Sequence, residues 1–326
     1  MDTEHFDPLT CIPAHETFFV GKKDVPCALP PALAPLADSH THLTSLHHID
    51  PAYAMARAAV AGVRFMVTVV DPTDDATDPG KLYDDLAAWE DGCEEILKAW
   101  CEAGVVDALG EPPCTPRVRM LAGCHPHNAR LFDDDARSVL QELLSNSRCS
   151  GVGEIGLDYH YDLSPRDVQL AVFKEQFELA CELNAPLSLH IREAHKDAFA
   201  LMKNYTLPAA GTILHCFDLG YEDAEPFLNL GCLLGIGGAV TFGRSDNTRA
   251  AVCTAGRGRI LTETDAPYMA PEPLRGTRCE PAYIAITTRF IADMMESAGL
   301  ATAKTFYEDA YEDCCAIFDG EPPVQK

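Results

Sequence analysis

Residues 151–157 read Gly151-Val152-Gly153-Glu154-Ile155-Gly156-Leu157, a short apolar run that carries one carboxylate. A run of this length is typical of a strand that is buried on both faces. Similar runs recur along the chain, each followed by a longer stretch with helical character, at about 36–43, Val63–Val70, Val118–Cys124, Pro186–Ile191, Gly211–Phe217, Gly231–Val240 and Arg259–Asp265. This alternation predicts an α/β fold with a parallel sheet and crossover helices.

Eight such repeats predict a closed (β/α)8, TIM-like barrel over residues 36–320, with a doubly wound open sheet as the structural alternative. Helices are expected over four ranges: 51–61, 166–184, 281–298 and 303–318. The second is the clearest, because Leu170, Phe173, Phe177 and Ala180 share one helical face. Ser164-Pro165 before it resembles an N-cap residue followed by proline in the first turn.

Two regions lie outside this repeating pattern. Residues 1–35 contain six prolines and no clear periodicity, so we expect an N-terminal extension there. The stretch from about residue 71 to residue 117 separates the second and third strand runs and is rich in Asp and Glu. We interpret this stretch as a helix with a surface insertion, whose charges form a solvated face.

The composition limits the classes of partner. The chain has 326 residues, with 25 Lys and Arg against 50 Asp and Glu, which gives a formal net charge of −25. Such a surface repels anionic lipid and gives no long-range attraction to nucleic acid, so a nucleic-acid substrate needs a local cationic site. The 14 cysteines form no Cys-x-x-Cys pair, and the N-terminus resembles no secretory signal. We therefore expect a cytoplasmic protein with reduced thiols, no membrane partner and no obligate protein partner.

Residues that can bind metals stand at the ends of five of the predicted strands. In a barrel, functional groups come from the carboxyl ends of the strands. His40 and His42 are two residues apart on an extended chain, so their side chains point to the same face. The other strand-end candidates are Glu154, His190, His215 and Asp265, and His125 and His127 end a further strand.

A buried Glu154 in an apolar, glycine-rich run is costly without a compensating cation. Four histidines and two carboxylates are too many ligands for one tetrahedral zinc ion, whereas they suit two ions that share a carboxylate. We assign His40, His42, Glu154 and Asp265 to one ion and Glu154, His190 and His215 to the other, with Glu154 bridging. Nitrogen and oxygen ligands fit Zn, Mg, Mn, Co or Ni. Asp265 is also a candidate general base for a water molecule.

The motifs that contain these residues resemble the TatD family of metal-dependent hydrolases. The resemblance rests on Asp38–His42, Gly123–His127, Gly153–Asp158, His190–Ala194, His215–Phe217 and Glu263–Tyr268. It implies a TIM-like barrel, a divalent-metal centre with the six ligands named above, and deoxyribonuclease or 3′–5′ exonuclease activity. One departure is the segment Arg278-Cys279-Glu280-Pro281, where the family usually has Arg-Asn-Glu-Pro.

Three further residues are candidates for binding substrate. His125 stands at a strand end, and Arg192 and Arg278 suit a phosphate because guanidinium groups bind it bidentately. The first hypothesis is a dinuclear nuclease that acts on DNA ends or single-stranded DNA, with Asp265 and Glu154 as catalytic residues. The alternatives are a barrel hydrolase of a small phosphoester, amide or lactone, and a non-catalytic metal-binding protein.

Overall fold

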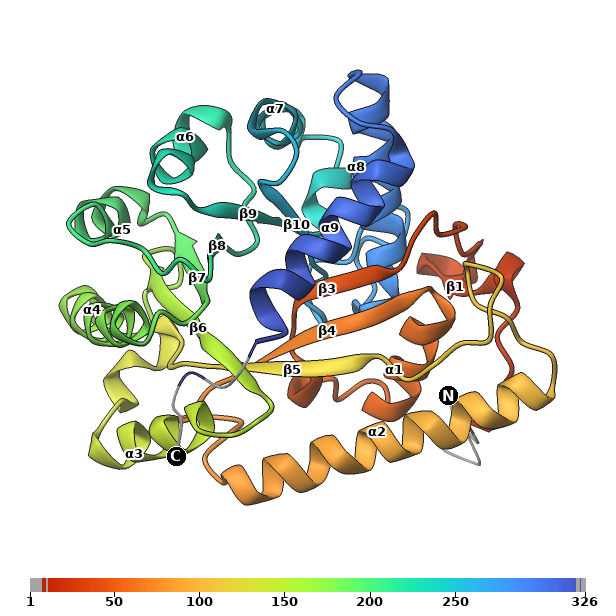
Figure 1. Ribbon diagram of the computed structural model, residues 1–326, viewed down its shortest axis with the longest axis horizontal. Helices are drawn as coiled ribbons and strands as arrows, with labels where there is room; N and C mark the ends of the chain where they lie inside the picture. Colours follow the sequence, from red (N-terminus) through yellow and green to blue (C-terminus); the bar gives the residue numbers. More distant parts are fainter. Residues whose placement is uncertain (1–7, 10, 321–322, 324–326) are drawn as a thin grey trace.

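The core of the molecule is an eight-stranded parallel sheet, seen in a computed structural model that describes residues 8–9, 11–320 and 323 (Figure 1). The strands follow one another around the sheet in chain order. They are β3 (Leu36–Thr41), β4 (Val63–Val70), β5 (Arg117–Ala122), β6 (Cys149–Asp158), β7 (Leu187–Arg192), β8 (Thr212–Leu214), β9 (Leu233–Ile236) and β10 (Ile260–Thr262). Each predicted strand run has its counterpart here, so the predicted barrel is confirmed.

The sheet is a nearly closed barrel because the chain after β10 pairs with β3. The backbone N–H of Asp265 donates to the carbonyl of His40 at 2.9 Å, and that of His42 donates to the carbonyl of Ala266 at 2.8 Å. The buried Asp38 carboxylate adds a link, since it accepts from the backbone N–H of Thr264 at 2.9 Å. The seam of the barrel is therefore made by the segments that carry three of the predicted metal ligands.

Helices alternate with the strands and cover the outside of the barrel (Figure 1). They are α1 (Pro51–Val60), α2 (Pro79–Glu102), α3 (Asp134–Leu144), α4 (Arg166–Leu183), α5 (His195–Met202), α6 (Tyr221–Leu230), α7 (Asp246–Ala255), α8 (Ile284–Ser297) and α9 (Ala303–Phe318). None of the helices in the described part of the chain has both the length and the apolar composition of a membrane span. All 14 cysteines are free thiols.

Helix α4 differs from its prediction in two details. Its N-cap residue is Pro165, and the Ser164 hydroxyl instead donates to the carbonyl of His127 at 2.8 Å. Leu170 is exposed, because Gln169 and Gln176 share the buried face with the phenylalanines. Both amides hold strand ends: Gln169 accepts from the backbone N–H of Asp158, and Gln176 accepts from that of Cys124.

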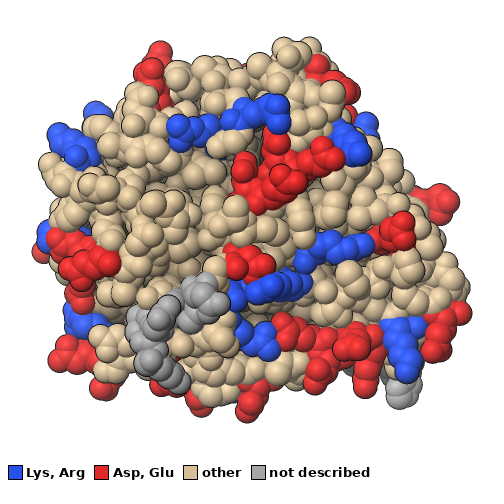
Figure 2. All heavy atoms as spheres, in the orientation of Figure 1, with Lys and Arg blue, Asp and Glu red and all other residues tan. Residues whose placement is uncertain are grey.

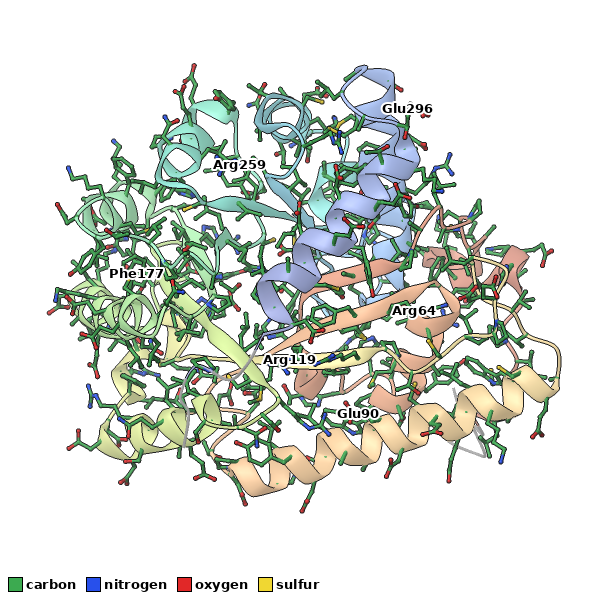
Figure 3. The ribbon with its side chains drawn as sticks, viewed as in Figure 1. Arg64, Glu90, Arg119, Phe177, Arg259 and Glu296 are labelled. Carbon is green, nitrogen blue, oxygen red and sulfur yellow. The ribbon has the colours of Figure 1, made fainter. Side chains whose placement is uncertain are left out.

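The acidic stretch between β4 and β5 contains the 24-residue helix α2. Its apolar face, which includes Leu82, Leu86 and Trp100, is buried. Acidic side chains gather along the edge of the molecule where α2 runs (Figure 2). Glu90 of α2 makes a two-point ion pair with Arg148, which lies just before β6 (Figure 3). Asp71 is an exception to the predicted solvated face, because it is buried at the end of β4.

Part of the predicted N-terminal extension packs against the barrel helices. Residues 1–7 and residue 10 lie outside the described part of the chain. Strands β1 (Phe19–Val20) and β2 (Pro26–Cys27) form a small antiparallel pair. The rings of Phe18 and Phe19 are buried, and the guanidinium of Arg57 in α1 lies 4.4 Å from the centroid of the Phe18 ring.

The inside of the barrel is apolar where the strands begin. Phe65, Val67 and Leu121 form a buried cluster with Cys314 and Phe318 of α9. Arg119 of β5 donates to the carbonyl of Gly320 just after this helix (Figure 3). Helix α9 therefore closes the amino-terminal end of the barrel, which leaves the carboxyl ends of the strands for the polar residues.

Candidate metal centre

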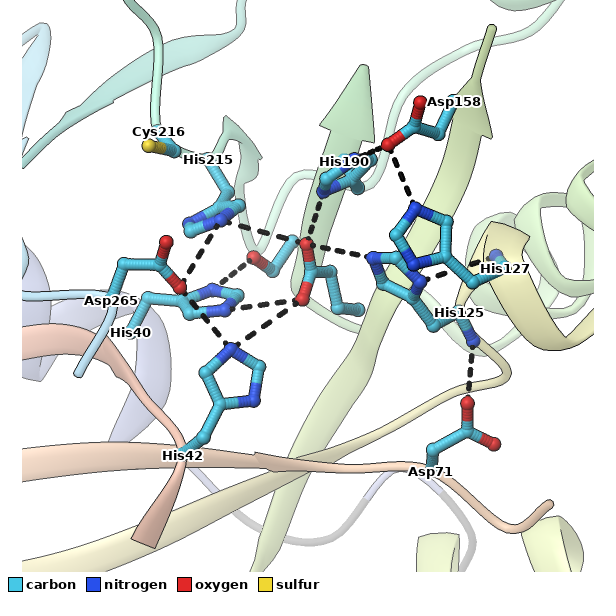
Figure 4. A network of polar contacts seen from close by, with 12 residues as sticks. His40, His42, Asp71, His125, His127, Asp158, His190, His215, Cys216 and Asp265 are labelled. Carbon is cyan, nitrogen blue, oxygen red and sulfur yellow. Dashed lines mark hydrogen bonds and ion pairs between the residues drawn. The ribbon is translucent and has the colours of Figure 1, made fainter. Parts of the chain in front are cut away.

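The Glu154 carboxylate of β6 is surrounded by imidazole rings from other strands (Figure 4). Its Oε1 lies 2.6 Å from Nδ1 of His190, 3.5 Å from Nε2 of His215 and 3.6 Å from Nε2 of His125. Its Oε2 lies 3.4 Å from Nε2 of His40 and 3.8 Å from Nε2 of His42. The His40 and His42 rings thus meet the same carboxylate oxygen, as their two-residue spacing predicts.

The strand pairing is irregular at two of the candidate ligands, Glu154 and His40. Between β6 and β7, Val152 pairs with Leu187 but Ile155 pairs with Leu189, so β6 has one extra residue around Gly153 and Glu154. β3 has the same feature around Ser39 and His40, because Asp38 pairs with Met66 of β4 but Thr41 pairs with Thr68. Such bulges redirect a side chain and are common beside functional sites.

Asp265 lies on the side of the cluster nearest to β3 (Figure 4). Its Oδ1 is 3.2 Å from Nε2 of His42 and 3.8 Å from Nε2 of His215. The backbone of Asp265 has a φ of 54°, in the left-handed region that non-glycine residues seldom adopt. A backbone outlier held between two strands is typical of a functional position.

Further polar groups fix the outer nitrogens of the histidines. Glu263 lies 3.1 Å from Nδ1 of His215, and Asp158 lies 3.1 Å from Nε2 of His190 and 2.9 Å from Nε2 of His127. The Ser188 hydroxyl is hydrogen-bonded to Nδ1 of His40 at 3.0 Å. Partners of this kind orient histidines that bind metals. The Glu263 carboxylate fits because residue 235 is glycine: a Cβ there would lie 2.3 Å from its Oε2.

The electrostatics keep both carboxylates ionised. Burial opposes the charge on Glu154, but His215, His125 and His190 around it hold its pKa well below the usual value. For Asp265, burial is likewise outweighed by His215 and His42, which lower its pKa. Burial lowers the pKa of both His190 and His215, but the nearby carboxylates outweigh it. Glu154 raises the pKa of His190 to about 9, and Glu263 and Glu154 raise that of His215 to about 10.

The residues present fit divalent cations. His40 Nε2 is buried and makes no hydrogen bond among the described residues, although Glu154 Oε2 lies 3.4 Å away, while its Nδ1 is held by Ser188. A buried nitrogen that lacks a hydrogen bond is costly, and a bound ion would complete it. Ligand atoms lie within 4.8 Å of one another in His40, His42 and Glu154, and again in Glu154, His190 and His215. His40, His215 and Asp265 form a third such group.

The barrel therefore brings together all six residues that the sequence predicts as metal ligands. His125 joins them through Glu154, and burial lowers the pKa of its imidazole to about 4. Arg192 is exposed at the end of β7, two residues after His190, with its guanidinium 4.8 Å from the centroid of the Tyr161 ring. Arg278 is exposed and lies near His48, and no hydrogen bond or ion pair among the described residues joins it to the cluster.

Some residues around the cluster were not singled out by the sequence. Ser188 and Asp158 bond to predicted ligands, and Asp71 accepts from the backbone N–H of His125 at 3.0 Å. Asp158 ends the run that contains Glu154, so a polar residue at that strand end was the available signal. Asp71 likewise follows a strand directly, but it stands in an acidic stretch that obscures it.

Comparisons with known proteins identify the family to which this chain is similar. The family described as TatD related DNase matches residues 37–312. The metal-dependent hydrolase YcfH of Escherichia coli K12 is 30% identical over 263 residues, which are 79% of this chain and 87% of that protein. The 3′-5′ ssDNA/RNA exonuclease TatD of Pantoea vagans is 35% identical over 168 residues, 50% of this chain and 65% of that protein.

A solved structure shows the same fold. The crystal structure of YJJV, a TatD homologue from Escherichia coli K12, superposes with a TM-score of 0.69 at 22% sequence identity. The match covers 89% of this chain and 100% of that one. The barrel architecture, including its nearly closed sheet, is therefore shared with a protein of known structure.

Proposed function

The chain belongs to the TatD related DNase family and is a metal-dependent hydrolase, and we propose that it hydrolyses phosphodiester bonds at the ends of single-stranded DNA. The observation that carries the proposal is the Glu154 carboxylate, which faces five imidazole nitrogens at the carboxyl end of the barrel. Four of them lie at 2.6–3.6 Å and the fifth, Nε2 of His42, lies at 3.8 Å. The name of the Pantoea vagans relative, an exonuclease of single-stranded DNA and RNA, supports the choice of substrate.

We propose that the centre holds two divalent ions. His40, His42, Glu154 and Asp265 would hold one, and Glu154, His190 and His215 the other. Nitrogen and oxygen donors of this kind suit Zn, Mg, Mn, Co or Ni. When bound, the ions supply Lewis-acid chemistry: they acidify water and stabilise negative charge on phosphoryl oxygens.

The residues of the chain have separate tasks in this proposal. Asp265 is ionised, so its Oδ1 accepts the proton of the attacking water. The water oxygen forms a bond to phosphorus, the bond from phosphorus to the departing sugar oxygen breaks, and that oxygen takes up a proton. Glu154 fixes the relative positions of the histidines. His125, Arg192 and Arg278 are proposed to contact phosphate oxygens, and Arg192 is the cation that stands at the end of β7 beside His190.

The 14 free cysteines fit a reducing environment, and we propose the cytoplasm as the compartment. The substrate in that compartment is a polyanion, which the net charge of −25 repels at long range. Binding therefore depends on groups at the barrel mouth rather than on the surface as a whole.

The test is degradation of a 5′-labelled single-stranded oligonucleotide in the presence of Mg²⁺, Mn²⁺, Zn²⁺, Co²⁺ or Ni²⁺, read on a denaturing gel. We expect stepwise shortening with at least one ion and no shortening by Asp265→Asn. Asp135→Asn, an exposed carboxylate of α3, is the matched control and is expected to retain activity. If no ion supports cleavage and the protein hydrolyses a lactone or an amide instead, the nuclease proposal is wrong and the chain is a hydrolase of that other bond.

A further inference from the structure

Two exposed tyrosines flank the metal centre. Tyr161 and Tyr268 keep 54% and 55% of their surface in contact with solvent, which is unusual for large aromatic rings. Each meets one histidine of the site edge to face: the ring centroids of Tyr161 and His127 are 5.4 Å apart, and those of Tyr268 and His42 are 5.8 Å apart. Both rings are therefore anchored by the site while part of their surface stays open.

The two anchoring histidines lie at opposite ends of the polar network, with His42 beside Asp265 and His127 beside Asp158 (Figure 4). His42 is on the Oε2 side of Glu154, next to Asp265. His127 is on the Oε1 side, where Asp158 links it to His190. A phosphate bound at the cluster would thus have one exposed aromatic ring on each side.

The two rings have different charged neighbours. The guanidinium of Arg192 lies 4.8 Å from the centroid of the Tyr161 ring, and the neighbouring Glu193 carboxylate is hydrogen-bonded to His160 at 2.7 Å. On the other side, Tyr268 contacts the His42 ring, and the Asp75 carboxylate accepts from the hydroxyl of Thr44, two residues after His42. A planar guanidinium stacked on an aromatic ring leaves the cation free to contact phosphate.

We propose that Tyr161 and Tyr268 are stacking platforms for the two nucleobases on either side of the cleaved phosphodiester bond. This inference rests on the proposed nuclease function and names how its substrate is held. Base–aromatic stacking is sequence-tolerant and independent of net charge, so it explains how a chain with a charge of −25 binds a polyanion. Bases must be unpaired to stack on protein rings, which selects single strands.

The charge difference orients the strand. A nucleotide inside the strand carries a further phosphate, which suits the Arg192 side at Tyr161. The terminal nucleotide has only the phosphate that is cleaved, so it suits the Tyr268 side, where Asp75 stands beside the loop that follows His42. A phosphate on the terminal hydroxyl would approach the Asp75 carboxylate and be repelled.

The test of stacking compares oligonucleotides with and without a base. The substrates are a normal single strand and strands in which the terminal or the adjacent nucleotide is replaced by a tetrahydrofuran abasic residue. Because one stacked base is worth about 5- to 150-fold in binding, we expect Tyr161→Ala and Tyr268→Ala to raise KM about tenfold on the normal strand. Each is expected to change KM less than twofold on the strand that lacks the base at its own position.

Three controls separate stacking from damage to the site. Tyr161→Phe and Tyr268→Phe keep the ring and should behave as wild type. Leu163→Ala removes an exposed side chain from the same loop as Tyr161 and should leave KM unchanged on every strand. Fluorescence anisotropy of labelled strands in the Asp265→Asn background gives the same comparison for binding alone. Equal effects on strands with and without bases would overturn the inference.

The test of orientation uses terminal phosphates. We expect a 3′-phosphate to slow cleavage at least tenfold relative to a 3′-hydroxyl, a 5′-phosphate to have no effect, and Asp75→Asn to restore part of the lost rate. No block by a 3′-phosphate, or a block by a 5′-phosphate instead, would overturn the orientation. If wild type cleaves no strand at all, the proposed function itself fails. If it cleaves strands with and without bases equally, only the present inference fails.

Discussion

The two ends of the barrel are built from the same eight strands but contain opposite kinds of residue. Where the strands begin, Phe65, Val67 and Leu121 pack on Phe318 of α9, and the cluster is apolar throughout. Where the strands end, Glu154 and its surrounding histidines are buried or half-buried within about hydrogen-bond distance of one another. One end is packed for stability, whereas the other holds polar groups whose burial costs free energy.

This difference indicates where the free energy of unfolding comes from. Apolar burial at the α9 end stabilises the fold without any ligand. At the polar end, Nε2 of His40 is buried with the Glu154 carboxylate 3.4 Å away and makes no hydrogen bond among the described residues, so a bound cation adds stability there. Changes at the two ends should therefore separate activity from stability.

The largest separation is expected from Glu154→Gln. Removal of the charge takes away the group that faces both sets of histidines, and we expect activity on single-stranded DNA to fall on the order of 10³-fold or more, because an essential metal ligand is lost and with it several kcal/mol of transition-state stabilisation. The metal-free variant should be less stable than metal-free wild type in urea at neutral pH, because protonated His190 and His215 lose the carboxylate that raises their pKa. Glu142→Gln on α3 is the control; a Glu154→Gln enzyme within tenfold of wild type would contradict the assignment.

The converse change is Phe318→Ala at the α9 end. Loss of a fully buried phenylalanine costs about 3–5 kcal/mol of unfolding free energy, and Phe318 is 1% exposed. Urea denaturation should show this loss while kcat at low temperature stays near wild type. Phe318→Leu should cost less, since it leaves a smaller cavity. A large fall in kcat with no loss of stability would mean that the two ends are not separable.

Metal removal should lower the Tm by an amount that depends only on the metal-binding end of the barrel. An ion present at about 100 times its Kd stabilises the protein that binds it by about 2.7 kcal/mol, which is about 4 °C in Tm for a chain of 326 residues. Thermal denaturation with and without a chelator should show this shift in wild type and in Phe318→Ala. In Glu154→Gln the shift should be absent or small, and a full shift there would refute the metal assignment.

A smaller effect is expected from Glu263→Gln. Glu263 accepts from the backbone N–H of Cys216 at 2.5 Å and faces Nδ1 of His215 at 3.1 Å. Loss of such a supporting carboxylate lowers metal affinity or activity about 10–100-fold. Titration with Zn²⁺ or Mn²⁺, followed by activity, measures it. Glu272→Gln on an exposed loop should have no effect, and equal results for the two variants would remove Glu263 from the site.

The sequence predicts the eight strands and the six ligands because both depend on local patterns. Short apolar runs are read from neighbouring residues, and His40 or Asp265 is recognised by its place at the end of such a run. The exposure of Leu170 could not be predicted, because it depends on Gln169 and Gln176 reaching strand ends from a helix. The burial of Asp71 is also a long-range effect, since it results from bonds to residues more than 50 positions away.

The most direct test of the account is the metal content of the purified protein, measured by inductively coupled plasma mass spectrometry. Wild type and Phe318→Ala should both contain two divalent ions per chain, and Glu154→Gln should contain at most one. Wild type without metal after titration, or Glu154→Gln with two ions, would contradict the claim that Glu154 joins two ions at the mouth of the barrel.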